Sequence, residues 1–137
     1  MQPVIDSFIA GFPVLILHSS VTIAMLVIGV LVYMWITPWD EVKLIRGGNT
    51  AAAVSMGGAI IGLALPLAFA MSASVSVYEI LVWGPVTLVL QIIAYRIADV
   101  VLRDVPARIE AGEMGAAVLL VCIKLAVAVI NAAAVAG

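Results

Sequence analysis

Four long apolar runs constrain this chain more than any other feature of its sequence. They cover about residues 13–36, 50–71, 80–101 and 113–135. An α-helix rises 1.5 Å per residue, so roughly 20 residues suffice to cross a hydrocarbon core of about 30 Å. Each run is long enough for one crossing, and 66% of all residues are hydrophobic while only 10% are charged. The sequence therefore predicts an integral membrane protein rather than a soluble domain.

Two charged segments divide these runs into pairs. We call residues 37–53 (TPWDEVKLIRGGNTAAA) the first hinge and residues 102–118 (LRDVPARIEAGEMGAAV) the second hinge. Each hinge carries the start and stop signals of a helix of about two turns. The sequence therefore predicts a short interfacial helix at each turn, lying flat with its apolar side toward the acyl chains.

In the first hinge, Thr37 is the expected cap and Pro38 suits the first helical position. We interpret the acids of the first turn, Asp40 and Glu41, as partners of the helix dipole rather than as a catalytic pair or a metal site. The remaining signals are Arg46 in the last turn, Gly48 as the stop, and Asn49 or Thr50 as the cap of the next span. In the second hinge, Asp104 is the expected cap and Gly112 the stop.

The two hinges also indicate an internal repeat. A shift of 64 residues superposes Ile45 on Ile109, Gly48 on Gly112, and residues 52–54 on residues 116–118. We predict an all-α, polytopic membrane protein with a single transmembrane domain over residues 1–137. Its four transmembrane helices form two hairpins as a parallel repeat, at about residues 13–72 and 79–136.

The positive charges predict the orientation. The turn after the first run contains Lys43 and Arg46, and Arg96, Arg103 and Arg108 surround the turn after the third. Both termini and the middle turn contain no Lys or Arg. By the positive-inside rule, both hinges are expected in the cytoplasm and both termini outside, which makes the repeat parallel rather than inverted.

The chain resembles the YjfL-like family of small bacterial inner-membrane proteins of unknown function, built from repeated pairs of transmembrane helices. The resemblance rests on the first hinge followed by GGAIIGLALPLAFA, on RIEAGEMGAAV and on the ending INAAAVAG. It covers nearly the whole chain from about Tyr33. It implies a bacterial inner membrane and a two-hairpin architecture, but no activity. The chain departs from the family pattern at Glu113, which puts in doubt any role that requires a second equivalent of Asn49.

Lys124 is the most unusual residue of the apolar runs. It lies near the middle of the fourth run, where a charged side chain costs at least about 2.5–3.5 kcal/mol. It needs a partner, water or deprotonation. Glu113 and Asn131 fall near the same helical face, but Glu113 is about 16 Å away along the axis and cannot neutralise Lys124 within this helix.

A matching polar stripe is predicted on the third run, because Thr87, Gln91 and Tyr95 step by four along it. Gln91 is the best match to the depth of Lys124. In the first run, His18 lies nearer the outer surface. The candidate polar path thus comprises Lys124, Gln91, Asn131, Glu113, His18, Thr87 and Tyr95.

Two interpretations of these stripes remain open. They line a hydrated path for an ion, a proton or a small solute, with Lys124 setting selectivity and His18 titrating near the mouth. Alternatively, Gln91, Thr87 and His18 cross-link helices, while Lys124 extends to an interface or pairs at a subunit contact.

The favoured function is an oligomeric membrane module for envelope maintenance or stress, with a scaffolding role; the alternative is a channel or transporter with a path past Lys124 and Gln91. Expected partners are the lipid bilayer, further copies of the chain, and a soluble cytoplasmic protein at the hinges. The homo-oligomer follows from small-residue ridges, such as Gly58 and Gly62, which one small bundle is not expected to cover. No catalytic residue, metal, cofactor or nucleic acid is expected, and the net charge is only -2.

Overall fold

The computed structural model describes residues 1–37, 40–73 and 76–136, and these residues form helices without any strand. The helices are α1 (Gln2–Ile36), α2 (Glu41–Arg46), α3 (Thr50–Ala73), α4 (Val77–Leu102), α5 (Val105–Glu110) and α6 (Met114–Ala136). Among the described residues, four helices, α1, α3, α4 and α6, are long and apolar enough to cross a membrane. The prediction of an all-helical membrane protein with four spans is therefore confirmed.

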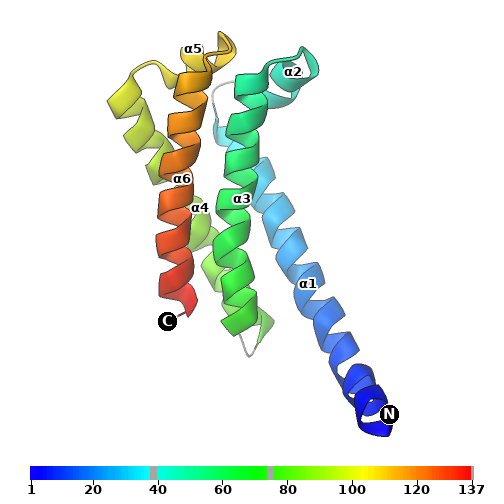
Figure 1. Ribbon diagram of the computed structural model, residues 1–137. Helices are drawn as coiled ribbons and strands as arrows, with labels where there is room; N and C mark the ends of the chain where they lie inside the picture. Colours follow the sequence, from blue (N-terminus) through cyan, green and yellow to red (C-terminus); the bar gives the residue numbers. More distant parts are fainter. Residues whose placement is uncertain (38–39, 74–75, 137) are drawn as a thin grey trace.

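The long helices form a bundle in which α3 and α6 lie side by side, with α4 behind them, while α1 tilts away toward its N-terminus (Figure 1). The short helices α2 and α5 lie together at one end of the bundle, which we call the hinge end. The contact between α3 and α6 is the most extensive between any two helices described.

Small residues allow α3 and α6 to approach closely. Ala52 and Ala59 of α3 are buried, as are Ala117 and Ala128 of α6. A Cβ atom added at Gly58 would come within 2.5 Å of Val121 Cγ2, so this part of the interface has room only for glycine. The small-residue ridges are thus covered within one chain, and the expectation that they would remain uncovered was wrong.

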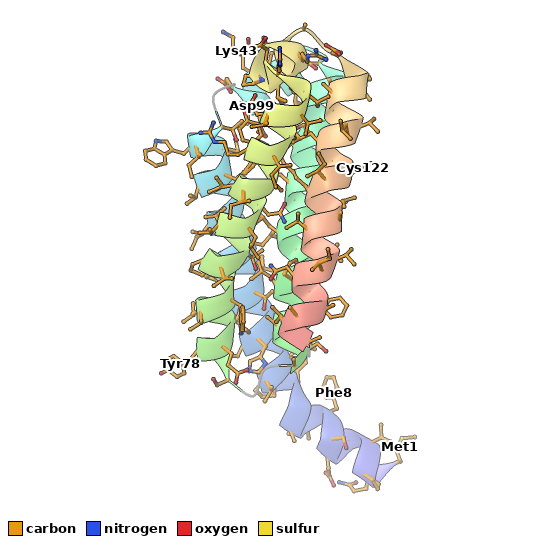
Figure 2. All side chains as sticks on the ribbon, turned by 90° about the vertical axis from the view of Figure 1, so that its left-hand side faces the viewer. Met1, Phe8, Lys43, Tyr78, Asp99 and Cys122 are labelled. Carbon is orange, nitrogen blue, oxygen red and sulfur yellow. The ribbon has the colours of Figure 1, made fainter. Side chains whose placement is uncertain are left out.

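Helix α1 is longer than the other spans. Its 35 residues correspond to about 52 Å, well beyond the roughly 30 Å of a hydrocarbon core. Residues 2–12 extend the helix instead of forming a separate surface segment. This part, which includes Phe8 and follows Met1, projects past the bundle at the end opposite the hinges and is exposed (Figure 2).

The two hinges make the same backbone hydrogen bonds at a constant offset of 64 residues. Gly48 N–H donates to Ile45 O and Gly112 N–H donates to Ile109 O, both at 3.0 Å. Four further pairs match in the same way. Gly48 and Gly112 both have positive φ, at 88° and 78°, a conformation that favours glycine because it has no Cβ. Equivalent residues of the two hinges therefore adopt equivalent turns.

The cap of α2 differs from the sequence prediction, whereas Asp104 lies at the predicted N-cap position of α5 without making the expected side-chain bond. Thr37 ends α1, since its Oγ1 donates to Tyr33 O at 2.7 Å, and the cap of α2 is Asp40, whose Oδ1 accepts from Lys43 N–H at 3.1 Å. Asp104 has a left-handed backbone, and its side chain makes no capping bond. Asp99 Oδ1 instead accepts from Val105 N–H at 3.3 Å. Pro38 lies outside the described residues.

Candidate functional site

Lys124 is fully buried in the interior of the bundle. Its ammonium group donates a hydrogen bond to the hydroxyl of Tyr33 and lies 4.2 Å from the centroid of the Tyr33 ring. Side chains on a helix tilt toward its N-terminus, and α6 begins at the hinge end. Lys124, about 15 Å below the start of α6, therefore reaches up toward the hinges inside the protein instead of extending to lipid.

Glu41 is the second buried charged residue. It lies in the first turn of α2, where a partner of the helix dipole is expected, but only 1% of it is exposed. Both of its carboxylate oxygens are buried without a hydrogen-bond partner among the described residues. Asp40 caps the helix from the exposed side, so the rotation of α2 carries the next side chain inward.

The environment of Glu41 changes its acidity. Burial raises the pKa of the Glu41 carboxyl from 4.5 to about 7, and the positive charge of Lys124 opposes this rise. Burial disfavours the charged form of an acid, whereas a nearby cation favours it. The carboxyl consequently changes its protonation state close to neutral pH.

Below Lys124, polar side chains of α4 and α6 continue the buried polar region. Gln91 Nε2 donates to the carbonyl of Lys124 at 3.5 Å, and its Oε1 is buried without a partner among the described residues. About two turns beyond Lys124 along α6, Asn131 Nδ2 donates to Thr87 Oγ1 at 3.3 Å. Thr87 Oγ1 in turn donates to Trp83 O at 2.8 Å.

We call this set the polar column. It runs from the hinge end to about 25 Å below it, which is the depth of Asn131 along α6. All of its side chains are buried, so in this conformation the column is closed to solvent. Beyond Asn131, the interior is apolar and includes Ile80, Leu67 and Ala70. The members of the column are Glu41, Tyr33, Lys124, Gln91, Thr87 and Asn131.

Three residues of the predicted path lie outside this column. Glu113 is exposed and pairs with Arg108 at 3.0 Å, the one ion pair within residues 1–37, 40–73 and 76–136. His18 is half-buried on α1, where its carbonyl accepts from Thr22 Oγ1 at 2.7 Å. Tyr95 is buried in the apolar cluster near the second hinge, with the Arg96 guanidinium 5.6 Å from its ring centroid. The described contacts do not join Glu113 or His18 to Lys124.

The hinges themselves enclose a surface groove. Asn49 ties them together, because its Nδ2 donates to Ile109 O at 2.9 Å and to Glu110 O at 3.2 Å, while its Oδ1 accepts from Ala52 N–H at 3.0 Å. The groove beside it measures about 590 Å³. Its lining includes Asp40, Lys43, Gly48, Asn49, Glu110 and Gly112. Arg46 is exposed in the last turn of α2, outside this lining.

Sequence reasoning missed two members of the column, Tyr33 and Glu41. Tyr33 falls near the end of the first run, on roughly the same helical face as His18, but it was not included in the predicted path. One signal was present: a lysine in an apolar run requires a partner, which a polar side chain on a neighbouring helix can provide. The part of the chain that the structure describes contains no group of three His, Cys, Asp or Glu side chains able to hold a metal ion.

Comparison with known proteins gives a family match. A family described as Domain of Unknown Function (DUF350) matches residues 7–135. Two similar proteins are the UPF0719 inner membrane proteins YjfL of Escherichia coli strain K12 and of Escherichia coli O157:H7. Each is 33% identical over 78 residues, which is 57% of this chain and 59% of the relative. The match thus spans less than two thirds of these relatives. No solved structure gives a significant match.

Proposed function

We propose, since this chain belongs to the DUF350 family of membrane proteins without an assigned function, that it transports protons across the bacterial inner membrane along the polar column. The observation that carries this proposal is the complete burial of Lys124, hydrogen-bonded to Tyr33, among the other buried polar groups of the column. Ionisable groups inside a membrane domain are costly and mark ion or proton pathways.

A proton suits the column better than a hydrated ion. The side chains of Lys124, Gln91 and Thr87 are at most 1% exposed, which leaves no room for an ion with its water shell. A proton can pass between hydrogen-bonding groups without such room. The apolar interior around Ile80 then acts as the barrier, and transport requires this layer to open or hydrate during the cycle.

The test is proton flux into vesicles that contain the purified chain and an enclosed pH-sensitive dye, driven by a potassium diffusion potential. We expect wild-type flux above that of empty vesicles, and Lys124→Met to reduce it to the empty level. Lys43→Met is the matched control, because Lys43 is an exposed lysine of the first hinge. Equal flux in wild-type and empty vesicles would refute the proposal.

A second candidate function is a docking module at the hinges, serving envelope maintenance or stress responses. The groove between α2 and α5 favours it, since its lining combines Asp40, Lys43 and Glu110 with exposed backbone at the glycine turns. A photoreactive residue at Lys43 would then form one reproducible adduct with a soluble protein in cells. The same residue at Tyr78, exposed at the opposite end, would not form it (Figure 2). Identical adducts at both positions would count against docking.

We also propose an orientation in the membrane and a repeat architecture for the chain. We place both hinges in the cytoplasm and both termini outside, with α2 and α5 as interfacial helices of two parallel hairpin repeats. The equivalent hydrogen bonds of the two hinges support the repeat. We also propose a homo-oligomer, supported now by the largely exposed apolar surface of α1 rather than by the ridges of α3 and α6. Cross-linking in native membranes that yields only monomers would refute the oligomer.

A further inference from the structure

We propose that Glu41 is the site at which protons enter and leave the polar column, acting as the exchangeable carboxyl of a buried pair with Lys124. This inference rests on the proposed transport function and extends it to a particular residue. It stands on the position of Glu41 in the hinge fold, on its unpartnered oxygens and on the charges that face it.

The fold of the hinge does not itself require a charge at this position. The equivalent residue of the second hinge, 64 positions later, is Val105, which is fully buried at the start of α5. An apolar side chain therefore fills the same site in α5. The equivalent of Lys124 is Ile60, which is 38% exposed on α3. Glu41 and Lys124 are therefore both charged at positions where the other repeat has an apolar residue. The two opposite charges interact with each other.

The groups around Glu41 leave its carboxyl available for exchange. Lys124 of α6 and Tyr33 of α1 are the ionisable groups that interact with it, and Tyr95 of α4 interacts with Tyr33. Helix α3, against which α2 packs, contains no ionisable residue. On the same hinge, the Asp40 side chain is engaged in capping α2. Lys124 thus provides the opposite charge, but no described residue donates a hydrogen bond to either carboxylate oxygen of Glu41.

The exchange step is a simple protonation. Because Glu41 is buried in this conformation, exchange requires water to reach it from the hinge side. A hydronium ion then transfers one proton to a carboxylate oxygen of Glu41, forming one O–H bond and leaving water. The carboxyl becomes neutral, and Lys124 loses its compensating charge. Release to water reverses the step. Glu41 lies at the hinge end and Lys124 lies below it. Protonation therefore changes the charge of the column first at the end that faces the hinges.

Infrared spectroscopy of the full chain in vesicles tests this inference directly. The C=O stretch of a protonated carboxyl should titrate with a midpoint near pH 7, reflecting the pKa of Glu41 at about 7. Glu41→Gln should remove this band, and the control Glu110→Gln, which changes an exposed acid of the second hinge, should retain it. A band that persists in Glu41→Gln would overturn the assignment.

A second variant keeps the test valid if Glu41→Gln folds poorly. Lys124→Met retains the carboxyl and removes the opposite charge, so the midpoint should rise by about one pH unit or more. An unchanged midpoint would show that Lys124 and Glu41 are not a pair. Proton flux should also fall roughly a hundredfold in Glu41→Gln, as expected for loss of a positioned proton-transfer group.

The two proposals fail in different ways. If wild-type vesicles carry no protons but the band titrates and disappears in Glu41→Gln, the transport function is refuted and the exchange site stands. If wild-type flux depends on Lys124 but is unchanged in Glu41→Gln, transport stands and the role of Glu41 is refuted.

Discussion

Two adjacent acids of the first hinge show how strongly the environment of a residue decides its chemistry. Asp40 is exposed and caps α2, whereas Glu41 is buried beneath it. A helix turns by about 100° per residue, so neighbouring side chains of α2 face opposite environments. A carboxylate therefore caps a helix at Asp40, whereas at Glu41, one residue later, it is an ionisable group inside the protein.

The burial of Glu41 makes the stability of the protein depend on pH. Its pKa in the fold is about 7, raised from 4.5, so the folded state binds the proton more tightly than the unfolded state. This stabilisation is complete below pH 4.5 and is lost as the pH rises through 7. Each pKa unit corresponds to about 1.4 kcal/mol, so the full effect is on the order of 3 kcal/mol.

Thermal unfolding in detergent measures this effect. We expect the unfolding temperature of the wild type to decrease as the pH rises across this window, and Glu41→Gln to remove most of the decrease. Glu110→Gln should behave like the wild type, because Glu110 is exposed. A Glu41→Gln protein with the wild-type pH dependence would show that another group is responsible.

At the scale of elements, the close packing of α3 on α6 holds the polar column together. Lys124 and Asn131 lie on α6, and a Cβ at Gly62 of α3 would come within 2.9 Å of Gln91 Oε1. In lipid, helix association depends on van der Waals contact and hydrogen bonds rather than on the hydrophobic effect. Small residues on α3 therefore determine how close the three helices come.

Separate substitutions of the adjacent glycines Gly57 and Gly58 test this packing. Gly58→Val should destabilise the fold by about 1–3 kcal/mol, the usual cost of overpacking, because its Cβ would meet Val121. Gly57→Val is the matched control, since a Cβ at Gly57 meets nothing within 4 Å. Unfolding in detergent should separate the two variants. Equal stability of both would show that the α3–α6 contact tolerates a larger separation.

At the scale of the whole molecule, charge and length define how the chain sits in a bilayer. Lys43 and Asp99 lie toward one end of the molecule and Tyr78 at the other (Figure 2). The hinge end contains the cationic residues of both turns, while α1 extends beyond the bundle at the opposite end. Such a helix has to tilt, or its first turns must leave the hydrocarbon core.

Labelling of single cysteines tests the predicted orientation. In a Cys122→Ala background, a membrane-impermeant maleimide added to intact spheroplasts should label Tyr78→Cys, which the predicted orientation places outside, but not Lys43→Cys. After the membrane is permeabilised, both positions should react, since both side chains are exposed. Labelling of Lys43→Cys in intact spheroplasts would reverse the orientation.

Much of the fold was predictable because its rules act over short stretches of chain. Backbone groups in lipid must be hydrogen-bonded within a helix, so long apolar runs determine four spanning helices. The glycine stops at Gly48 and Gly112 and the cap at Asn49 likewise depend on nearby residues, and the structure contains them. The assignment of Thr37 as the cap of α2 was wrong, since Asp40 caps that helix. Asp104 lies at the N-cap position of α5 but makes no capping bond, while Asp99 Oδ1 accepts from Val105 N–H.

Local patterns in the chain thus predict the membrane location, the four spans, the two hinges and the need of Lys124 for a partner. The packing of the helices shows that this partner is Tyr33, 91 residues away, and that Glu41 is also buried. The physical reason is the range of the interactions involved. Caps and turns form between neighbours in the chain, but the burial of a charge depends on how separate helices rotate and pack. This packing of the helices brings the candidate site, which includes Glu41 and Lys124, beneath the first hinge.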